Sequence, residues 1–247
     1  MTNTETDTKD SKADAKQDSS VAIAINILTS PAEAFRALEA RPTKIFPLAL
    51  VMISSSAVLF WYYSIVDFDW FVDDTLSQLN NMSEEAREAA RERMLSMSPT
   101  MFKGFGLLGS TVGVLAMFIL QSGYLSMASA LNGDRYRFSH WFSISVWTNL
   151  PTVLGAIGMI VTILLSPNGQ LSAYDLNPLT LANLGMTSDI GSVQTIMNSL
   201  NLLMFWSLGL TVTAYKQWVQ ASWHKTLAIV LGPYILIFCI WSYFAVF

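Results

Sequence analysis

Long uninterrupted runs of apolar residues dominate the chain after its first twenty residues. The clearest run, 45–66 (IFPLALVMISSSAVLFWYYSIV), contains 22 residues and no charge. Because a helix rises about 1.5 Å per residue and the hydrocarbon core of a bilayer is roughly 30 Å thick, this run predicts a helix that crosses a membrane once. Lys44 precedes the run, and Trp61, Tyr62 and Tyr63 lie near its far end. This arrangement is typical of a basic cytoplasmic anchor and an aromatic belt at the opposite interface.

Four more apolar runs follow along the chain. They cover residues 105–131, 141–165, 196–215 and 227–247. The run 196–215 is the weakest, because polar residues such as Asn198 and Asn201 dilute it. The pattern predicts an all-α fold in which residues 41–247 form a polytopic membrane bundle of five transmembrane helices.

The distribution of basic residues predicts how this bundle is oriented. With the N-terminus inside, the inside segments hold ten Lys and Arg residues and the outside segments hold four. The inside residues are Lys9, Lys12, Lys16, Arg36, Arg41, Lys44, Arg135, Arg137, Lys216 and Lys225, and the outside residues are Arg87, Arg91, Arg93 and Lys103. Short cytoplasmic loops are enriched in Lys and Arg. We therefore expect the N-terminus in the cytoplasm and the C-terminus outside.

The residues before the first long run divide into a tail and an apolar segment. Residues 1–20 are polar, mixed in charge and free of aromatic side chains, which predicts a disordered tail. Residues 21–40 are apolar at first but too short to span, and we expect them to lie on the membrane as an interfacial amphipathic segment.

A short helix is predicted within the interfacial segment. Ser30 is the expected N-cap, with Pro31 at the first helical position and Glu33 closing a capping box. Phe35 and Leu38 share one side of this helix and are its candidate lipid-binding or partner-binding residues. The alternative is an ordinary surface helix packed on protein.

The loop 67–104 is too polar to enter the bilayer, and it contains a predicted external helix at about 83–97. Ser83 is its expected cap, Glu84 and Glu85 suit the positive end of the helix dipole, and Ser98-Pro99 ends it.

Two sets of residues are of a type that can bind metal ions. The aspartates at the start of this loop could offer oxygen ligands to a divalent cation: Asp67, Asp69, Asp73 and Asp74. They lack the glycine and the spacing of an EF-hand loop, so a solvated acidic loop is the favoured interpretation. His140 and His224 have no HExxH motif and no nearby carboxylate pair, so no metal site is predicted.

Composition removes several classes of function. Hydrophobic residues make up 52% of the chain and charged residues 13%, so a large water-soluble core is not expected. The net charge of −4 and the lack of a basic patch exclude a nucleic-acid-binding protein. Cys239 is the single cysteine, which excludes an intrachain disulfide. The N-terminus has no basic segment followed by an apolar one, so no signal peptide is expected.

The predicted spans contain no ionisable side chain unless the fourth is extended to Lys216. Because intramembrane ionisable groups mark proton relays, a proton-coupled transporter is disfavoured. A channel lined by neutral groups remains an alternative function, with Gln121 and Asn149 as candidate ligand-path residues. Pro151 removes a backbone hydrogen bond in the third run, which indicates either a kink that shapes packing or a binding site. No G-x-S-x-G motif supports a hydrolase.

Three stretches resemble bacterial Yip1-domain proteins. They are ILTSPAEAFRALEARPTKIFPLAL (27–50), SVWTNLPTVLGAIGMI (145–160) and LMFWSLGLTVTAYKQWVQASWHKTLAIVL (203–231). The resemblance implies five helical spans, a cytoplasmic N-terminus and a bacterial inner membrane. Eukaryotic members of the family are associated with Rab GTPases and vesicle traffic, whereas the bacterial members have no settled activity to carry over. The chain departs from the family in its long acidic first external loop, and it has no DLYGP-like motif. No catalytic residue or cofactor is implied.

These observations favour a non-enzymatic integral membrane protein that acts as a scaffold or recruits a partner. Arg135 and Arg137, in a short inside loop, join Phe35 and Leu38 as candidate contacts for a cytoplasmic protein partner or for lipid headgroups. The alternative is a channel or permease for small solutes or ions, formed by a homo-oligomer of the bundle, with Gln121, Asn149 and Pro151 along its path. No cofactor is expected in either case.

Overall fold

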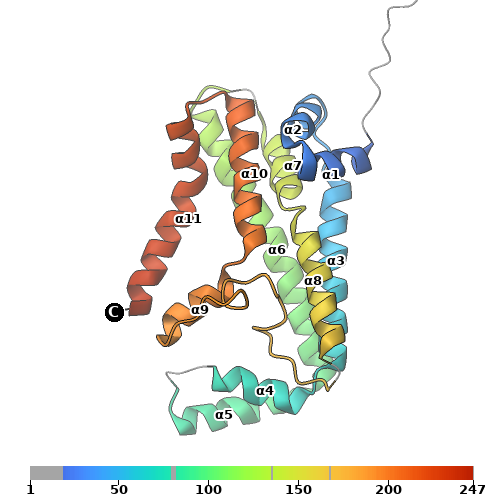
Figure 1. The fold of residues 1–247 in the computed structure, drawn as a ribbon, viewed down its shortest axis with the longest axis vertical. Helices are drawn as coiled ribbons and strands as arrows, with labels where there is room; N and C mark the ends of the chain where they lie inside the picture. The colour runs from blue at the N-terminus through green and yellow to red at the C-terminus, as the bar shows by residue number, and fades with distance from the viewer. Residues whose placement is uncertain (1–18, 79–81, 135, 167, 247) are drawn as a thin grey trace, which may run out of the picture.

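The computed structural model describes residues 19–78, 82–134, 136–166 and 168–246, and within these ranges it is a bundle of eleven helices (Figure 1). Residues 1–18 of the predicted disordered tail lie outside the described residues, whereas Ser19 and Ser20 are the N-cap and the first residue of α1. The helices are α1 (Ser20–Thr29), α2 (Pro31–Ala40), α3 (Ile45–Ile65), α4 (Phe68–Ser77), α5 (Glu84–Leu95), α6 (Pro99–Ala130), α7 (Phe138–Thr148), α8 (Thr152–Leu165), α9 (Gly191–Ser199), α10 (Leu202–Val219) and α11 (Trp223–Val246).

Four helical segments in the described chain are long and apolar enough to cross a membrane. They are Ile45–Ile65, Pro99–Ala130, Phe138–Leu165 and Trp223–Tyr243. Only 6% to 33% of the most apolar stretch of each segment is buried within the protein, as expected for helices that contact lipid. The predicted helical membrane fold is therefore confirmed. Helix α10 runs beside α11 (Figure 1) but is shorter and contains Lys216, so the fifth crossing stays a prediction.

Local capping explains where the helices α6 and α10 begin. Helix α6 starts six residues earlier than the predicted run, because the Ser98 side chain accepts a hydrogen bond from the Met101 amide and Pro99 takes the first helical position. The single helix predicted at 196–215 is wrong. Helix α9 ends at Ser199, and Asn201 caps the separate helix α10 by accepting from the Met204 amide.

The third apolar run is two helices joined by a break at Asn149 and Pro151. Pro151 has no amide hydrogen, and the carbonyl of Trp147, which it leaves free, accepts from the Leu150 amide instead. Asn149 lies at the break and donates from its side chain to the carbonyl of Ser145 at 2.8 Å. The sequence therefore indicates the position of the irregularity correctly, and the irregularity is a break between α7 and α8.

The two ends of the bundle differ in charge. At the end where α1, α2 and the start of α11 lie (Figure 1), the described charged residues are six basic and three acidic: Arg36, Arg41, Lys44, Arg137, Lys216 and Lys225 against Glu33, Glu39 and Asp134. We call this the basic end. At the opposite end, α4 and α5 carry eight acidic and three basic residues: Asp69, Asp73, Asp74, Glu84, Glu85, Glu88, Glu92 and the capping Asp67 against Arg87, Arg91 and Arg93. We call this the acidic end.

A folded layer covers the acidic end. The helix predicted at about 83–97 is present as α5, with Ser83 as its cap, and its location outside the membrane stays a prediction. Helix α4, which the sequence analysis treated as loop, precedes it. The segment after α8 is fixed to the end of α3, because Tyr62 donates to the Leu171 carbonyl at 2.8 Å and the Asp67 amide donates to the Gly169 carbonyl at 3.0 Å.

Candidate functional site

The N-terminal helices are part of the bundle at the basic end. Phe35 and Leu38 have no exposed surface, and both belong to a core that includes Trp147 of α7 and Tyr215 of α10. The expectation that these two side chains enter the membrane interface is therefore wrong, and the alternative of a helix packed on protein describes α2. A helix facing lipid and one facing protein share the same apolar pattern, so the sequence could not separate them.

Two side chains of α10 hold α2 from one side. The Trp218 indole N–H donates to the Phe35 carbonyl at 2.9 Å, and the Gln217 side-chain amide donates to the Ala32 carbonyl at 3.1 Å. Backbone carbonyls of one helix thus accept hydrogen bonds from another helix about 180 residues away, which fixes both the distance and the rotation of α2 on the bundle.

The turn after α2 is held from a second side by α7. The Trp147 indole N–H donates to the Thr43 carbonyl at 2.8 Å, and Ser143 donates to the same oxygen. Lys44, the expected basic anchor, donates to the Ser139 hydroxyl at 2.8 Å. The predicted capping box at the start of α2 is absent, since the Ser30 side chain accepts no bond, although Pro31 does take the first helical position. Tertiary contacts hold this helix in its place.

Aromatic rings fill the space beneath these contacts. Tyr136 stacks on Trp218 with 5.0 Å between ring centroids, and Trp141 lies 5.3 Å from Tyr215 and 5.7 Å from Trp218. The Tyr136 hydroxyl also donates to Glu39 of α2. Aromatic pairs of this geometry add to the stability that buried area supplies. This cluster was not predicted from the sequence, although the position of its tyrosines and tryptophans near both short basic loops is a signal that could have located it.

The outer surface of the basic end carries both exposed basic side chains and an exposed tryptophan. Arg36, Arg41, Arg137 and Lys225 are exposed, and Trp223 is 59% exposed beside the Lys216 ammonium. Arg137 precedes α7, where its amide donates to the His140 side chain. Arg135 lies outside the described residues. Side chains of this mixture are typical of proteins at the interface of lipid headgroups and water.

A second candidate site is a pocket of about 150 Å³ inside the bundle. It is lined by Met117, Phe118, Gln121, Asn149, Met204, Ser207, Leu208 and Tyr234. The structure brings Gln121 and Asn149 together, with 3.5 Å between the Asn149 amide nitrogen and the Gln121 side-chain oxygen. Pro151 contributes to the break that exposes Asn149 but does not line the pocket. The pocket-lining side chains are neutral.

The aspartates at the acidic end are divided among different protein partners. Asp67 caps α4 by accepting from the Trp70 amide, Asp74 accepts from the Ser172 hydroxyl, and Asp73 pairs with Arg91 at 2.6 Å. The hydrogen bond and the charge of Asp73 raise the pKa of Arg91 above its ordinary value. Among the described residues, no group of three or more His, Cys, Asp or Glu is placed to hold a metal ion.

The family of this chain follows from a comparison with known protein families. A model of the Yip1 domain matches residues 25–244, which is most of the chain and includes the three stretches noted in the sequence. No curated protein and no solved structure matches the chain. The match extends from α1 through α11 and so covers both the basic end and the pocket. The chain therefore belongs to the Yip1 domain family.

Proposed function

We propose that the protein is a non-enzymatic scaffold or partner-recruiting adaptor in a bacterial inner membrane, with the basic end facing the cytoplasm as its docking surface. The observation that supports this most directly is the attachment of α2 to α7 and α10 through Trp218, Trp147 and Lys44. This attachment of α2 holds Arg36 and Arg41 in fixed positions on the surface. A fixed, exposed cationic surface attracts anionic headgroups or an acidic partner at about 1 kcal/mol per residue near the membrane.

Helix α1 supplies the contact with lipid that was expected of the whole segment 21–40. It contains no charged residue and lies across the direction of the spanning helices (Figure 1). Val21 and Ile25 are 57% and 56% exposed on one side, while Ile23 and Ile27 are buried on the other. An uncharged helix with this exposed stripe suits the headgroup boundary.

Photocrosslinking tests the docking surface directly. A photoreactive amino acid at Arg41 is expected to capture one reproducible protein partner in native membranes, because Arg41 is exposed at the basic end. The matched control is the same amino acid at Glu85, which is exposed at the acidic end. Capture of the same set of proteins from both positions, or of none from Arg41, contradicts the adaptor proposal.

The alternative, a permease, predicts solute flux from purified protein in vesicles. A single file of water across a core of roughly 30 Å needs about ten molecules at hydrogen-bond spacing. The pocket of about 150 Å³ has the volume of about five waters, which favours the scaffold over conduction by one chain. Flux of a small solute that Asn149→Leu abolishes would favour the permease. Absence of flux together with capture at Arg41 supports the adaptor.

A further inference from the structure

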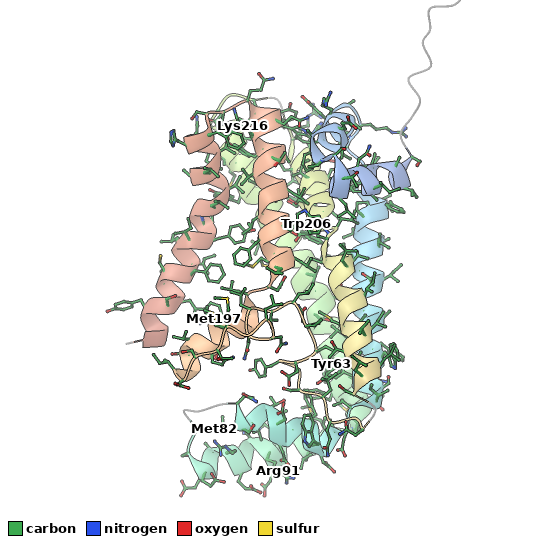
Figure 2. The ribbon with its side chains drawn as sticks, in the orientation of Figure 1. Tyr63, Met82, Arg91, Met197, Trp206 and Lys216 are labelled. Carbon is green, nitrogen blue, oxygen red and sulfur yellow. The ribbon has the colours of Figure 1, made fainter. Side chains whose placement is uncertain are left out.

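The pocket between α6, α10, α11 and the break after α7 lies about halfway along the spanning segments that line it. Asn149 is 11 residues after the start of α7, and Tyr234 is 11 residues after the start of α11. At about 1.5 Å per residue both are about 16 Å from the basic end of their spans, which is half of a roughly 30 Å core. Trp206, the residue before Ser207, marks the α10 wall in Figure 2.

The polar groups in this pocket are only partly satisfied by the protein. Asn149 donates to the Ser145 carbonyl, and the Gln121 oxygen lies 3.5 Å from its amide nitrogen. Ser207 is 5% exposed, and its hydroxyl has no hydrogen-bond partner in the described chain. Within the same described residues, the Gln121 amide nitrogen, the Asn149 oxygen and the Tyr234 hydroxyl also have no protein partner.

Unpartnered polar groups at this depth call for a partner inside the pocket. Hydrocarbon offers no hydrogen bonds, so buried polar groups in membrane proteins are satisfied by protein, by water or by a ligand. Here the groups come from four separate elements and line the same volume, so one occupant can satisfy them together. The broken backbone at Asn149 adds to this, because irregular backbone at membrane depth is tolerated where it lines a cavity.

We propose that this pocket binds a small uncharged molecule that carries both hydrogen-bond donors and acceptors, of the size of acetamide or glycerol. The Gln121 amide donates, the Asn149 oxygen accepts, and the hydroxyls of Ser207 and Tyr234 do either. A charged molecule is disfavoured, since none of the lining residues could neutralise it. A volume of about 150 Å³ accommodates four to six non-hydrogen atoms, on the scale of about 30 Å³ per water.

This site is separate from the basic end and does not rest on the adaptor proposal. Binding in the pocket and capture of a partner at Arg41 are measured in different experiments, so either can fail alone.

Saturation-transfer NMR on the full chain in nanodiscs of deuterated lipid tests the proposal. The probes are acetamide and glycerol, and acetate is the control because it has the shape of acetamide and a full charge. Ser207→Ala removes the unpartnered hydroxyl, and Ser207→Leu also fills the pocket. The control variant is Thr213→Leu, on the same helix but outside the pocket-lining residues.

The expected result is saturation of acetamide or glycerol by the unmodified protein and little saturation of acetate. Ser207→Leu should lower the signal at least fivefold and Ser207→Ala about twofold to threefold, while Thr213→Leu leaves it unchanged. Acetamide alone indicates an amide ligand, and glycerol alone indicates a polyol. Equal signals in all variants, equal saturation of acetate, or no signal from either neutral probe overturns the proposal.

Discussion

Tyr124 supplies a hydrogen bond that Pro233 removes from the backbone of α11. Pro233 lies inside this helix and lacks the amide hydrogen that would otherwise bond to the carbonyl of Ile229, four residues earlier. The hydroxyl of Tyr124, from α6, donates to that same carbonyl at 2.8 Å. A side chain of one helix thus replaces the missing backbone donor of another, which is how membrane helices tolerate proline.

We predict that Tyr124→Phe destabilises the fold by about 1 kcal/mol, the usual size of a hydrogen bond between membrane helices. The control is a double-mutant cycle with Pro233→Ala, which restores a backbone donor for the Ile229 carbonyl. In that background Tyr124→Phe should cost much less. Unfolding in detergent mixtures measures both differences. An equal cost in the two backgrounds would mean that Tyr124 stabilises the protein in some other way.

Gly169 is the glycine whose replacement should be most harmful. Its φ is +72°, and a Cβ there would lie 2.7 Å from the carbonyl oxygen of Ile65. Gly185 has a φ of +96° with nothing within 4 Å, so it isolates the effect of backbone conformation. Gly185→Ala should cost about 1–2 kcal/mol, and Gly169→Ala should cost clearly more. Thermal unfolding of the two variants decides this, and equal losses would exclude a steric role for Gly169.

Single residues show why sequence predicts part of this structure and misses the rest. Ser83 caps α5 as predicted, because a cap is a local interaction of residues three apart. Phe35 was assigned to lipid and is buried, because its environment depends on Trp218, which is 183 positions away. Local chemistry could be predicted from this sequence, whereas the partner of an apolar face could not.

The same limit operates on whole helices. Hydropathy located the four strongly apolar helices because lipid imposes the same demand on every spanning segment. It missed α4, whose aspartates lower its apolar content, and it merged α9 with α10. In the pocket, Gln121 and Asn149 were predicted as candidates from polarity, but Ser207 and Tyr234 required the packing of α10 and α11.

The attachment of α2 to α10 can be weakened at Trp218 by a substitution that keeps an aromatic ring in the core. Trp218→Phe deletes the indole N–H that donates to the Phe35 carbonyl, at a cost of about 1 kcal/mol. That energy corresponds to about a fivefold rise in the opened form of the N-terminal helices. We expect trypsin to cleave after Arg36, an exposed residue of α2, about five times faster in this variant.

The control for this experiment is Trp206→Phe, on the same helix but 40% exposed on its surface. It should leave the cleavage rate after Arg36 unchanged. If both variants are cleaved at the rate of the unmodified protein, the bond from Trp218 does not hold α2 in place. The full chain must be used, because a fragment of residues 1–41 would expose Phe35 and Leu38 and bind lipid for that reason alone.

Across the whole molecule, charge divides along the bundle axis. Figure 2 shows Lys216 at the basic end and Arg91 at the acidic end, where Arg91 is paired with Asp73. Pairing leaves the acidic end with few free cations, whereas Arg36, Arg41 and Lys225 at the basic end are exposed. Since exposed basic residues in short loops are retained in the cytoplasm, this division favours the orientation expected from sequence.

Orientation and the number of crossings can be measured together with introduced cysteines. In a Cys239→Ser background, four exposed positions each receive one cysteine: Arg41, Glu85, Asp189 and Ser222. If the basic end is cytoplasmic and α10 crosses, an impermeant maleimide added to intact cells labels the cysteines at Glu85 and Asp189. Those at Arg41 and Ser222 react only after the membrane is opened. Matching behaviour at Asp189 and Ser222 would show that α10 does not cross, because it connects them. If the cysteine at position 41 is labelled in intact cells and the cysteine at position 85 is protected, the protein has the opposite orientation.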